Sequence, residues 1–302
     1  MTIMQEYSRT DITELPHPGR RSATNGKDVL AGTSIVVGVD GSIMSEAAVR
    51  WAAAEAAVRR ARLKLVHAFI WPLLRLPPGC GELLLNLKVM ADNVVRESLE
   101  IAHTAAAEVP ADGGKVAGYP LPVLLGESRT ADLLVVGSGG PDSTLGPLIG
   151  SVSAELAAHA YCPVVVIRPQ QSGQTAHRVV AGYDGSAASE AALDFALAHA
   201  NRHNLSLQVI TVRPPHSDGH NVTEDLLATI KTRPAGACAQ LLYCDGHPAE
   251  QLLHHSADAE LVVLGSRGRG GFNGLPLGSV SQAVLQQAAC PVAVIPTTAD
   301  RR

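Results

Sequence analysis

Two glycine-rich segments carry residue types that can hold an anion. The first reads GSGGPDSTLGPLIGS at 137–151 and the second reads GSRGRGGFNGLPLGS at 265–279. Both fit the spacing Gly-x2-Gly-x9-Gly-Ser, and each runs into a stretch with helical spacing, at 152–160 or 280–288. Glycine exposes backbone N–H groups without a Cβ in the way, and the start of a helix attracts negative charge. The spacing therefore predicts two phosphate-binding loops.

The residues expected to act are the spaced glycines and the serine that follows the last of them. They are Gly137, Gly140, Gly150 and Ser151 in the first loop, and Gly265, Gly268, Gly278 and Ser279 in the second. The alternative is that the glycines only form tight turns and the serines only cap helices. Two loops of identical spacing favour the ligand role. Neither loop has the lysine of a P-loop, and no NAD-type Gly-x-Gly-x-x-Gly follows the first strand.

One aspartate follows each of two strand-like apolar runs. Asp40 comes after residues 34–39 and Asp184 after residues 178–183, each within Asp-Gly-Ser. A carboxylate beside a phosphate-binding loop can accept a hydrogen bond from a ribose hydroxyl or an adenine amino group. An ordinary turn-forming Asp-Gly pair is the alternative, and the accompanying loop favours the ligand role.

An internal duplication places these residues at equivalent positions. Residues 118–167 align without a gap with residues 246–295, and twenty-two of the fifty positions are identical. An earlier block, residues 35–52, matches residues 179–196. In both copies β-branched apolar runs alternate with alanine-rich helical stretches, which indicates a parallel sheet with helices on both faces. The sequence predicts an α/β protein of two tandem, doubly wound, Rossmann-like domains.

Composition excludes several classes of protein. Hydrophobic residues make up 46% of the 302 residues and aromatic residues 3%, which is typical of parallel strands covered by helices. The net charge is −4 and no basic run occurs, so a nucleic-acid partner is not expected. No apolar run is long enough to span a bilayer and no signal peptide is evident, so no membrane partner and a cytoplasmic location are expected.

The remaining candidate residues are expected to be structural. Five cysteines lack paired metal spacing and are expected to be reduced: Cys80, Cys162, Cys238, Cys244 and Cys290. His67 is expected to be a core histidine, and the adjacent His254 and His255 exposed helix residues. No Ser/His/Asp, Cys/His or paired-carboxylate set can be assembled from the spacing, which argues against a dedicated enzyme. No metal site is expected.

The motifs resemble the universal stress protein family in its tandem, ATP-binding form. The resemblance rests on Asp-Gly-Ser after the first strand, on the glycine loop and on a closing Cys-Pro-Val-x-Val-Ile, and covers most of residues 33–168 and 177–297. It implies a five-stranded parallel sheet of order 3-2-1-4-5 in each domain, as in adenine nucleotide α-hydrolases. It also implies that ATP, with Mg²⁺, binds at the carboxyl ends of the strands. Expected boundaries are a flexible tail at 1–28, domains at 29–168 and 177–302, and a linker at 169–176.

The resemblance also assigns contacts to the ligand and to a partner. Adenine and ribose would contact Val39, Asp40 and Ala68 in the first copy, and Tyr183, Asp184 and Val212 in the second. The sugar and phosphates would contact the loop residues named above. The last strands, 163–167 and 291–295, would pair within the chain as a pseudo-dimer or between chains in a homodimer.

The two copies differ in ways that predict unequal sites. The second loop has Arg267 and Arg269, where the first has Gly139 and Pro141 followed by the acidic Asp142. A charge about 6 Å from a phosphate is worth on the order of 0.5–1 kcal/mol even when screened, so the second copy is expected to bind ATP more tightly. The third strand of the first copy is expected to be short, at 115–117, against 237–244 in the second. Residues 70–114 show little family character beyond a helix expected at 84–108.

Three functions remain open from the sequence. In the first, ATP changes the shape or pairing of the domains of a stress-response protein, and an unidentified regulatory protein reads the result. In the second, the chain is a slow ATPase or a nucleotidyl- or phosphoryl-transferring enzyme. In the third, it is a structural or chaperone-like subunit with vestigial loops. The intact loops and the missing catalytic set favour the first.

Overall fold

The computed structural model of the chain describes residues 33–70, 81–139, 149–169, 177–212, 230, 239–269 and 275–297. The expected N-terminal tail lies outside the described residues, as does most of the expected linker. Five single residues considered above also lie outside them: Cys80, Gly140, Pro141, Asp142 and Cys238. The domain boundaries in these segments stay predictions.

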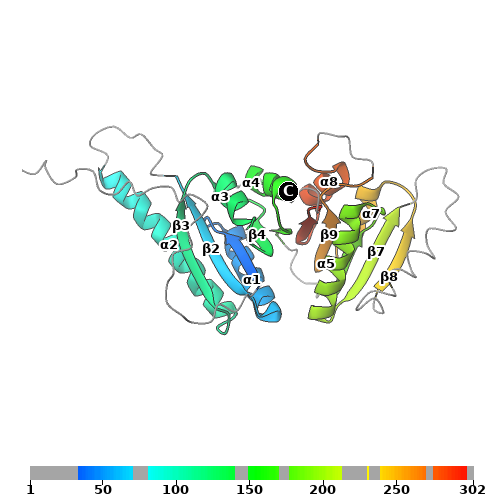
Figure 1. The fold of residues 1–302 in the computed structure, drawn as a ribbon, viewed down its shortest axis with the longest axis horizontal. Coiled ribbons are helices and arrows are strands. Elements are labelled where there is room, and N and C mark those ends of the chain that lie inside the picture. The colour runs from blue at the N-terminus through cyan, green and yellow to red at the C-terminus, as the bar shows by residue number, and fades with distance from the viewer. Residues whose placement is uncertain are drawn as a thin grey trace, which may run out of the picture. The chain divides into compact units, whose positions relative to one another are not determined.

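Strands and helices alternate in both copies, as the sequence predicts (Figure 1). The first copy contains β1 (Ser34–Gly38), α1 (Ile43–Arg59), β2 (Arg62–Phe69), α2 (Gly81–Ala105), β3 (Ala111–Ala117), α3 (Pro120–Glu127), β4 (Leu133–Gly137), α4 (Ser151–His159) and β5 (Val164–Ile167). The second contains β6 (Arg178–Gly182), α5 (Ala187–His203), β7 (Ser206–Val212), β8 (Ala239–Cys244), α7 (Pro248–Ser256), β9 (Leu261–Gly265), α8 (Ser279–Gln287) and β10 (Val292–Ile295). Among the described helices, none combines the length and apolar character that crossing a membrane requires.

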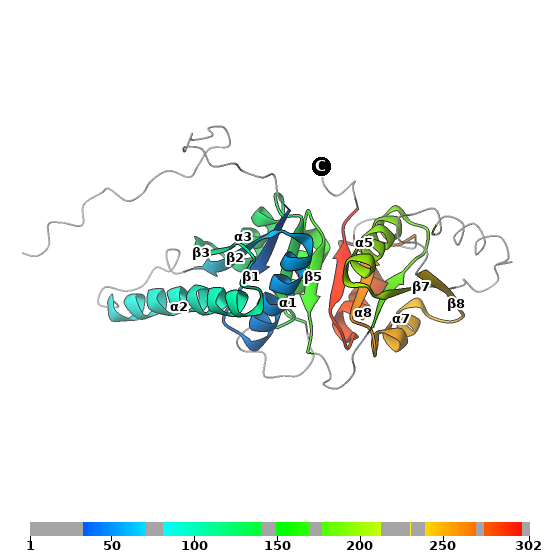
Figure 2. The ribbon, with the colours of Figure 1, turned by 90° about the horizontal axis from the view of Figure 1, so that it is seen from below.

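All ten strands join one sheet (Figure 2). Its order is β3-β2-β1-β4-β5-β10-β9-β6-β7-β8, so each half has the expected order 3-2-1-4-5 and is parallel throughout. The two halves meet where β5 and β10 pair antiparallel, with Val165 opposite Ala293. The structure therefore contains the intramolecular pairing of the last strands that the resemblance implies.

Each face of the sheet is covered by its own set of helices. Successive side chains of a strand point to opposite faces, and β1 shows this alternation clearly. Ile35 and Val37 pack with alanines of α1 in one core cluster, which also takes in α2 and α5. Val36 packs in the other cluster, with residues of α3, α4, α7 and α8. Both clusters contain residues from the two copies, so the cores continue across the junction of β5 and β10.

The third strand of the first copy corrects one expectation. β3 covers Ala111–Ala117 and pairs with β2 over Leu63–Phe69, so the short strand expected at 115–117 is wrong. Gly113 lets β3 lie close to α2, because a Cβ there would be 3.1 Å from Val95 Cγ1. Since β3 is a mostly exposed edge strand, it needs no buried apolar face, and its sequence ADGGKVA carries no strand pattern.

Candidate functional site

The sheet topology brings the aspartates and the glycine loops together. β1 pairs with β4, and β6 pairs with β9, all in parallel. Asp40 and Asp184 follow the first strand of each pair, and the glycine loops follow the second. All four segments therefore leave the carboxyl edge of the sheet, where open α/β sheets bind their ligands.

A pocket of about 550 Å³ lies at this edge of the second copy. It is lined by all eight residues that the sequence assigns to the second site: Tyr183, Asp184, Val212, Gly265, Arg267, Gly268, Gly278 and Ser279. Its volume falls within the range of small-molecule sites. The structure thus gathers residues from three strands, one loop and one helix start around a single cavity.

Apolar side chains form part of the pocket wall that motif reasoning missed. Ile210 on β7, Leu252 on α7 and Leu264 on β9 line the pocket and are nearly fully buried, while Leu275 is half exposed. Ile210 and Val212 are two residues apart on one strand, so they point to the same face. The two-residue alternation along β7 can be read from the sequence. The contribution of α7 cannot, because only the fold brings that helix to this edge of the sheet.

Asp184 is held in place by backbone donors. Its Oδ1 accepts a hydrogen bond from the Ser186 N–H at 3.0 Å, and its Oδ2 accepts one from the Arg269 N–H at 2.8 Å. Burial alone would raise the pKa of Asp184, but hydrogen bonds from Ser186, Arg269 and Ser189 outweigh it, and the pKa lies below its usual value. The turn-forming contact is present, and each oxygen still has a second lone pair for a ligand.

Two of the loop glycines have no room for a Cβ. A Cβ on Gly265 would lie 2.7 Å from the backbone carbon of Ala188, at the start of α5. A Cβ on Gly268 would lie 2.4 Å from Asp184 Oδ2. At Gly278 the nearest atoms would be 3.5 Å away, an ordinary contact, and its φ is −66°. Close packing against α5 therefore explains Gly265, whereas neither packing nor a positive φ requires glycine at 278.

The start of α8 closes one side of the pocket. Gly278 is the N-cap residue, no side chain caps the helix, and the Gly278 N–H donates to the Ser266 carbonyl at 2.8 Å. Ser279 is the first helical residue and is exposed, so the capping role expected as its alternative is wrong. The hydroxyl of Ser281 instead donates to the Gly265 carbonyl at 2.7 Å. The helix start therefore presents a positive dipole end and a hydroxyl to the pocket.

The described residues of the first copy make the same contacts around the aspartate and the helix start. Asp40 Oδ1 accepts from the Ser42 N–H at 2.9 Å, and the Gly150 N–H donates to the Ser138 carbonyl at 2.6 Å. Gly150 is the N-cap of α4, so capping by Ser151 is also wrong. Gly137 is required by packing, because its Cβ would lie 2.7 Å from the backbone carbon of Met44.

Val39 and Ala68 lie at the carboxyl ends of β1 and β2, as expected, and Val39 is buried. Gly140 and residues 141–148 lie outside the described residues. The expected phosphate end of the first site therefore stays a prediction.

The other residues singled out in the sequence lie away from the pocket. His67 Nδ1 is 2.8 Å from the Val39 carbonyl, and the side chain is only partly buried. His254 is exposed and His255 is partly buried, with their rings packed edge to face. Cys162 and Cys290 are buried, as expected. Burial raises the pKa of the Cys290 thiol to about 12, which argues against a reactive role at neutral pH.

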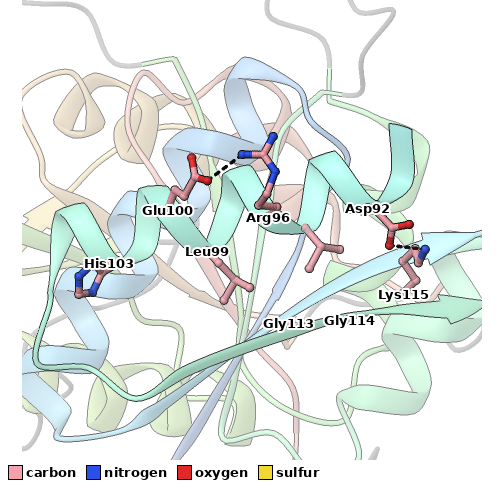
Figure 3. Close-up of a pocket in the computed structure, with 9 residues that line it drawn as sticks. Asp92, Arg96, Leu99, Glu100, His103, Gly113, Gly114 and Lys115 are labelled. Carbon is pink, nitrogen blue, oxygen red and sulfur yellow. Dashed lines mark hydrogen bonds and ion pairs between the residues drawn. The ribbon is translucent and has the colours of Figure 1, made fainter. Parts of the chain in front are cut away.

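A second cavity, of about 500 Å³, lies between α2 and β3 (Figure 3). Its charged side chains pair with each other: Arg96 donates to Glu100 Oε1 at 2.7 Å, and Lys115 forms an ion pair with Asp92. Leu99 and Val95 supply its apolar floor. None of the residues that the sequence assigns to a ligand lines this cavity. It is therefore not part of the candidate site.

The fold and the paired strand-end loops define a tandem Rossmann-like α/β protein. The sequence profile of the Universal stress protein family matches residues 33–168, 175–235 and 223–296. Two curated relatives, both from Mycobacterium tuberculosis, match over most of their length. Universal stress protein Rv2623 is 35% identical over 291 residues, covering 86% of this chain and 95% of the relative. Universal stress protein Rv2005c is 34% identical over 286 residues, covering 86% and 96%. The chain belongs to the universal stress protein family and is of the tandem type.

Solved structures agree on the fold. A universal stress protein from Archaeoglobus fulgidus superposes with a TM-score of 0.71, covering 88% of this chain and 99% of that one, at 22% sequence identity. At this level of identity the similarity is evidence for the fold alone, and it extends over both halves of the chain.

Proposed function

We propose that this tandem universal stress protein is a cytoplasmic, nucleotide-dependent regulator that binds ATP in the pocket of its second copy. The observation that carries the proposal is the convergence of all eight predicted residues on one cavity of suitable volume. Two of them, Asp184 and Ser279, come from segments far apart in the sequence and are expected to contact different parts of the nucleotide.

The pocket has chemically distinct walls that suit an adenine nucleotide. Ile210, Leu252 and Leu264 offer an apolar surface for a base, and the ionised Asp184 can accept from ribose hydroxyls. The start of α8 and Arg267 offer positive charge for phosphates. When bound, Mg²⁺ would neutralise part of the phosphate charge.

The second copy is proposed to bind ATP more tightly than the first. Arg267 lines the pocket, and the Arg269 N–H holds Asp184. The first copy has Gly139 at the position of Arg267. Mg-ATP titration into Asp40→Ala and Asp184→Ala variants tests this, and the Asp184→Ala variant is expected to lose the tighter site. Equal affinity of the two variants would contradict the proposed asymmetry.

The experiment begins by denaturing the purified protein and identifying any released nucleotide. The stripped protein is then titrated with Mg-ATP by calorimetry. Asp184→Ala should weaken binding by about tenfold or more, since it removes a charged acceptor worth roughly 1.5–3 kcal/mol. Ser279→Ala and Gly278→Ala test the helix start with little packing cost, whereas Gly265→Ala would disturb α5 and cannot serve. Exposed Glu100 on α2, changed to Ala, is the matched control.

Each result has a distinct meaning. Nucleotide that is bound and released unchanged, with loss in Asp184→Ala, supports the binding protein. Slow conversion of ATP to ADP that depends on the same residues would favour the enzyme. No nucleotide and no heat of binding would overturn the proposal in favour of a structural role.

A further inference from the structure

A buried polar cluster lies where α1 and α5 contact each other, and none of its residues lines the candidate nucleotide pocket. Glu55 comes from α1 of the first copy, and His199 and His203 come from α5 of the second. The side chains of Glu55 and His199 are each only 1% exposed, and that of His203 is 20% exposed. Neither the family motif nor the proposed function uses these residues.

The cluster joins equivalent positions of the two copies. At the sequence offset of 144 that relates the two helices, Glu55 corresponds to His199 and Arg59 corresponds to His203. The repeat therefore places equivalent positions face to face, and the copies have different residues there. One copy supplies a carboxylate, and the other supplies two imidazoles.

The ligand atoms of these three side chains converge. His203 Nε2 lies 2.6 Å from Glu55 Oε2, and His199 Nδ1 lies 3.4 Å from Glu55 Oε1. All three ligand atoms are within 4.8 Å of one another. His199 and His203 are spaced i, i+4, so both face the same side of α5. The three groups can therefore meet at one point.

His199 is the member that a hydrogen-bond cluster alone does not explain. Within the part of the chain that the structure describes, neither ring nitrogen makes a hydrogen bond although the ring is fully buried, and the 3.4 Å contact of Nδ1 with Glu55 Oε1 is an ion pair only if the imidazole is protonated. Its ring lies nearly parallel to those of Trp51 and Phe195, with ring centroids 6.1 Å and 6.3 Å away. A buried polar group without a partner is costly. A cation bound at Nδ1 would satisfy this nitrogen.

We propose that Glu55, His199 and His203 form a Zn²⁺ site that joins the two copies. Two imidazole nitrogens and one carboxylate oxygen are the donor set that Zn²⁺ accepts, whereas Ca²⁺ and Mg²⁺ prefer oxygen ligands. Three protein ligands leave a fourth position of the tetrahedron for water. The site lies near the last turns of both helices, whereas the candidate nucleotide pocket lies at the first turn of α5. It is independent of nucleotide binding.

The charged neighbours set the affinity and the mode of binding. Arg59 Nε donates to Glu55 Oε1, and an Arg202 guanidinium nitrogen lies 3.9 Å from the same oxygen. Burial alone would raise the pKa of Glu55, but the contacts with both histidines and the charge of Arg59 hold it well below its usual value. The carboxylate is therefore ionised, with Oε2 as the oxygen for the metal. The two guanidiniums repel a cation, so removing one should tighten binding.

The test is a Zn²⁺ titration of the full-length protein after treatment with EDTA and removal of nucleotide. One equivalent of Zn²⁺ is expected to bind and to raise the thermal unfolding midpoint, and Co²⁺ should give the absorption of a tetrahedral site. His203→Gln should weaken binding by at least about tenfold. Arg202→Gln should strengthen it by about threefold to tenfold, because it removes a cation near the ligand.

The control is a double variant, His254→Gln with His255→Gln, which removes two histidines from α7 and should bind Zn²⁺ like the wild type. Absence of a tetrahedral Co²⁺ spectrum in the wild-type protein would overturn the proposal and leave a buried hydrogen-bond cluster. Loss of binding in the α7 variant would also overturn it, because surface histidines would then account for the metal. Since Arg202→Gln keeps all three ligands, it remains informative if a ligand variant fails to fold.

Discussion

Glycines of one motif serve different physical purposes in this protein. Gly265 has no room for a Cβ because the first turn of α5 lies against it, and Gly137 is in the same position against α1. Gly278 and Gly150 have ordinary space around them and ordinary negative φ values. Both lie at the start of a helix, and Gly278 also lines the pocket. A motif of spaced glycines therefore combines positions that packing requires with positions that packing leaves unexplained.

Substitution of Gly265 by Ala should destabilise the fold, whereas the same change at Gly278 should not. The added Cβ at Gly265 meets backbone atoms that cannot turn away, so α5 must shift, at a cost of roughly 1–3 kcal/mol. Chemical denaturation of both variants measures the difference. Equal stability of the two variants would show that α5 can move freely.

Glu55→Gln should lower stability at neutral pH and have less effect in acid. The change leaves Arg59 and Arg202 without their counter-charge, at a cost of about 3 kcal/mol. Because the pKa of Glu55 is lowered by folding, its contribution is complete above the unfolded value, about 4.3, and is lost as the pH falls further.

Urea unfolding in EDTA from pH 7 to pH 3 checks this pH dependence. The difference between wild type and variant should shrink as the pH falls below about 4, where the carboxyl group of the unfolded chain becomes protonated. A difference that grows below about pH 4 would contradict the assignment.

At the scale of elements, α8 is anchored at both ends. Its start forms part of the candidate site, and its last carbonyls are held by Arg168, which follows β5 of the other copy and is 3% exposed. Arg168 donates to the carbonyls of Leu285 and Ala288 at 2.7 Å and of Gln286 at 2.9 Å. A cation at a helix carboxyl end also complements the dipole. One buried arginine thus connects the first copy to the helix that lines the second copy's pocket.

Arg168→Ala should lower the free energy of unfolding by about 2–4 kcal/mol. The change leaves two buried carbonyl groups, of Leu285 and Ala288, and the partly buried one of Gln286 without their donor. Thermal or chemical unfolding measures the loss. Arg96→Ala, which removes an exposed pair on α2, is the matched control and should cost less than about 1 kcal/mol. Similar losses in both variants would mean that Arg168 contributes only surface charge.

At the scale of the whole molecule, the ten-stranded sheet makes the two copies one folding unit. The antiparallel pair of β5 and β10 continues the sheet, and both core clusters extend through it. The strands at that junction are fully buried, unlike the exposed edge strand β3. Separating the copies would expose two apolar strands with unpaired backbone groups.

Cutting the chain within residues 170–176 should therefore leave the copies associated. A protease site introduced there allows the cut, and size-exclusion chromatography reports the result. We expect one species of unchanged size and a single unfolding transition. Two species of half size would show that covalent linkage alone holds the copies together.

The sequence predicted the order of elements, and the eight residues that it assigned to a second site line one pocket, because repeated, strongly patterned segments determine where these residues lie. Strands such as β4 and β9 are buried apolar runs, and the residues after them are set by motif spacing. β3 was mispredicted because an edge strand needs only backbone partners. Leu252 was missed because its place in the pocket depends on how α7 packs. The Glu55, His199 and His203 cluster was also missed, since its members are 144 and 148 residues apart and meet only through the junction of the copies.

The β5–β10 junction has a consequence for how such a chain can diverge. In a dimer of identical subunits, a residue on the two-fold axis meets its own copy, so every change there must be compatible with itself. Fusion of the copies into one chain removes that requirement, because each axial position now meets a partner encoded separately. A carboxylate can then face an imidazole where a homodimer would set two acids or two bases against each other. The fused chain can therefore evolve one asymmetric contact at a time while keeping a symmetric fold.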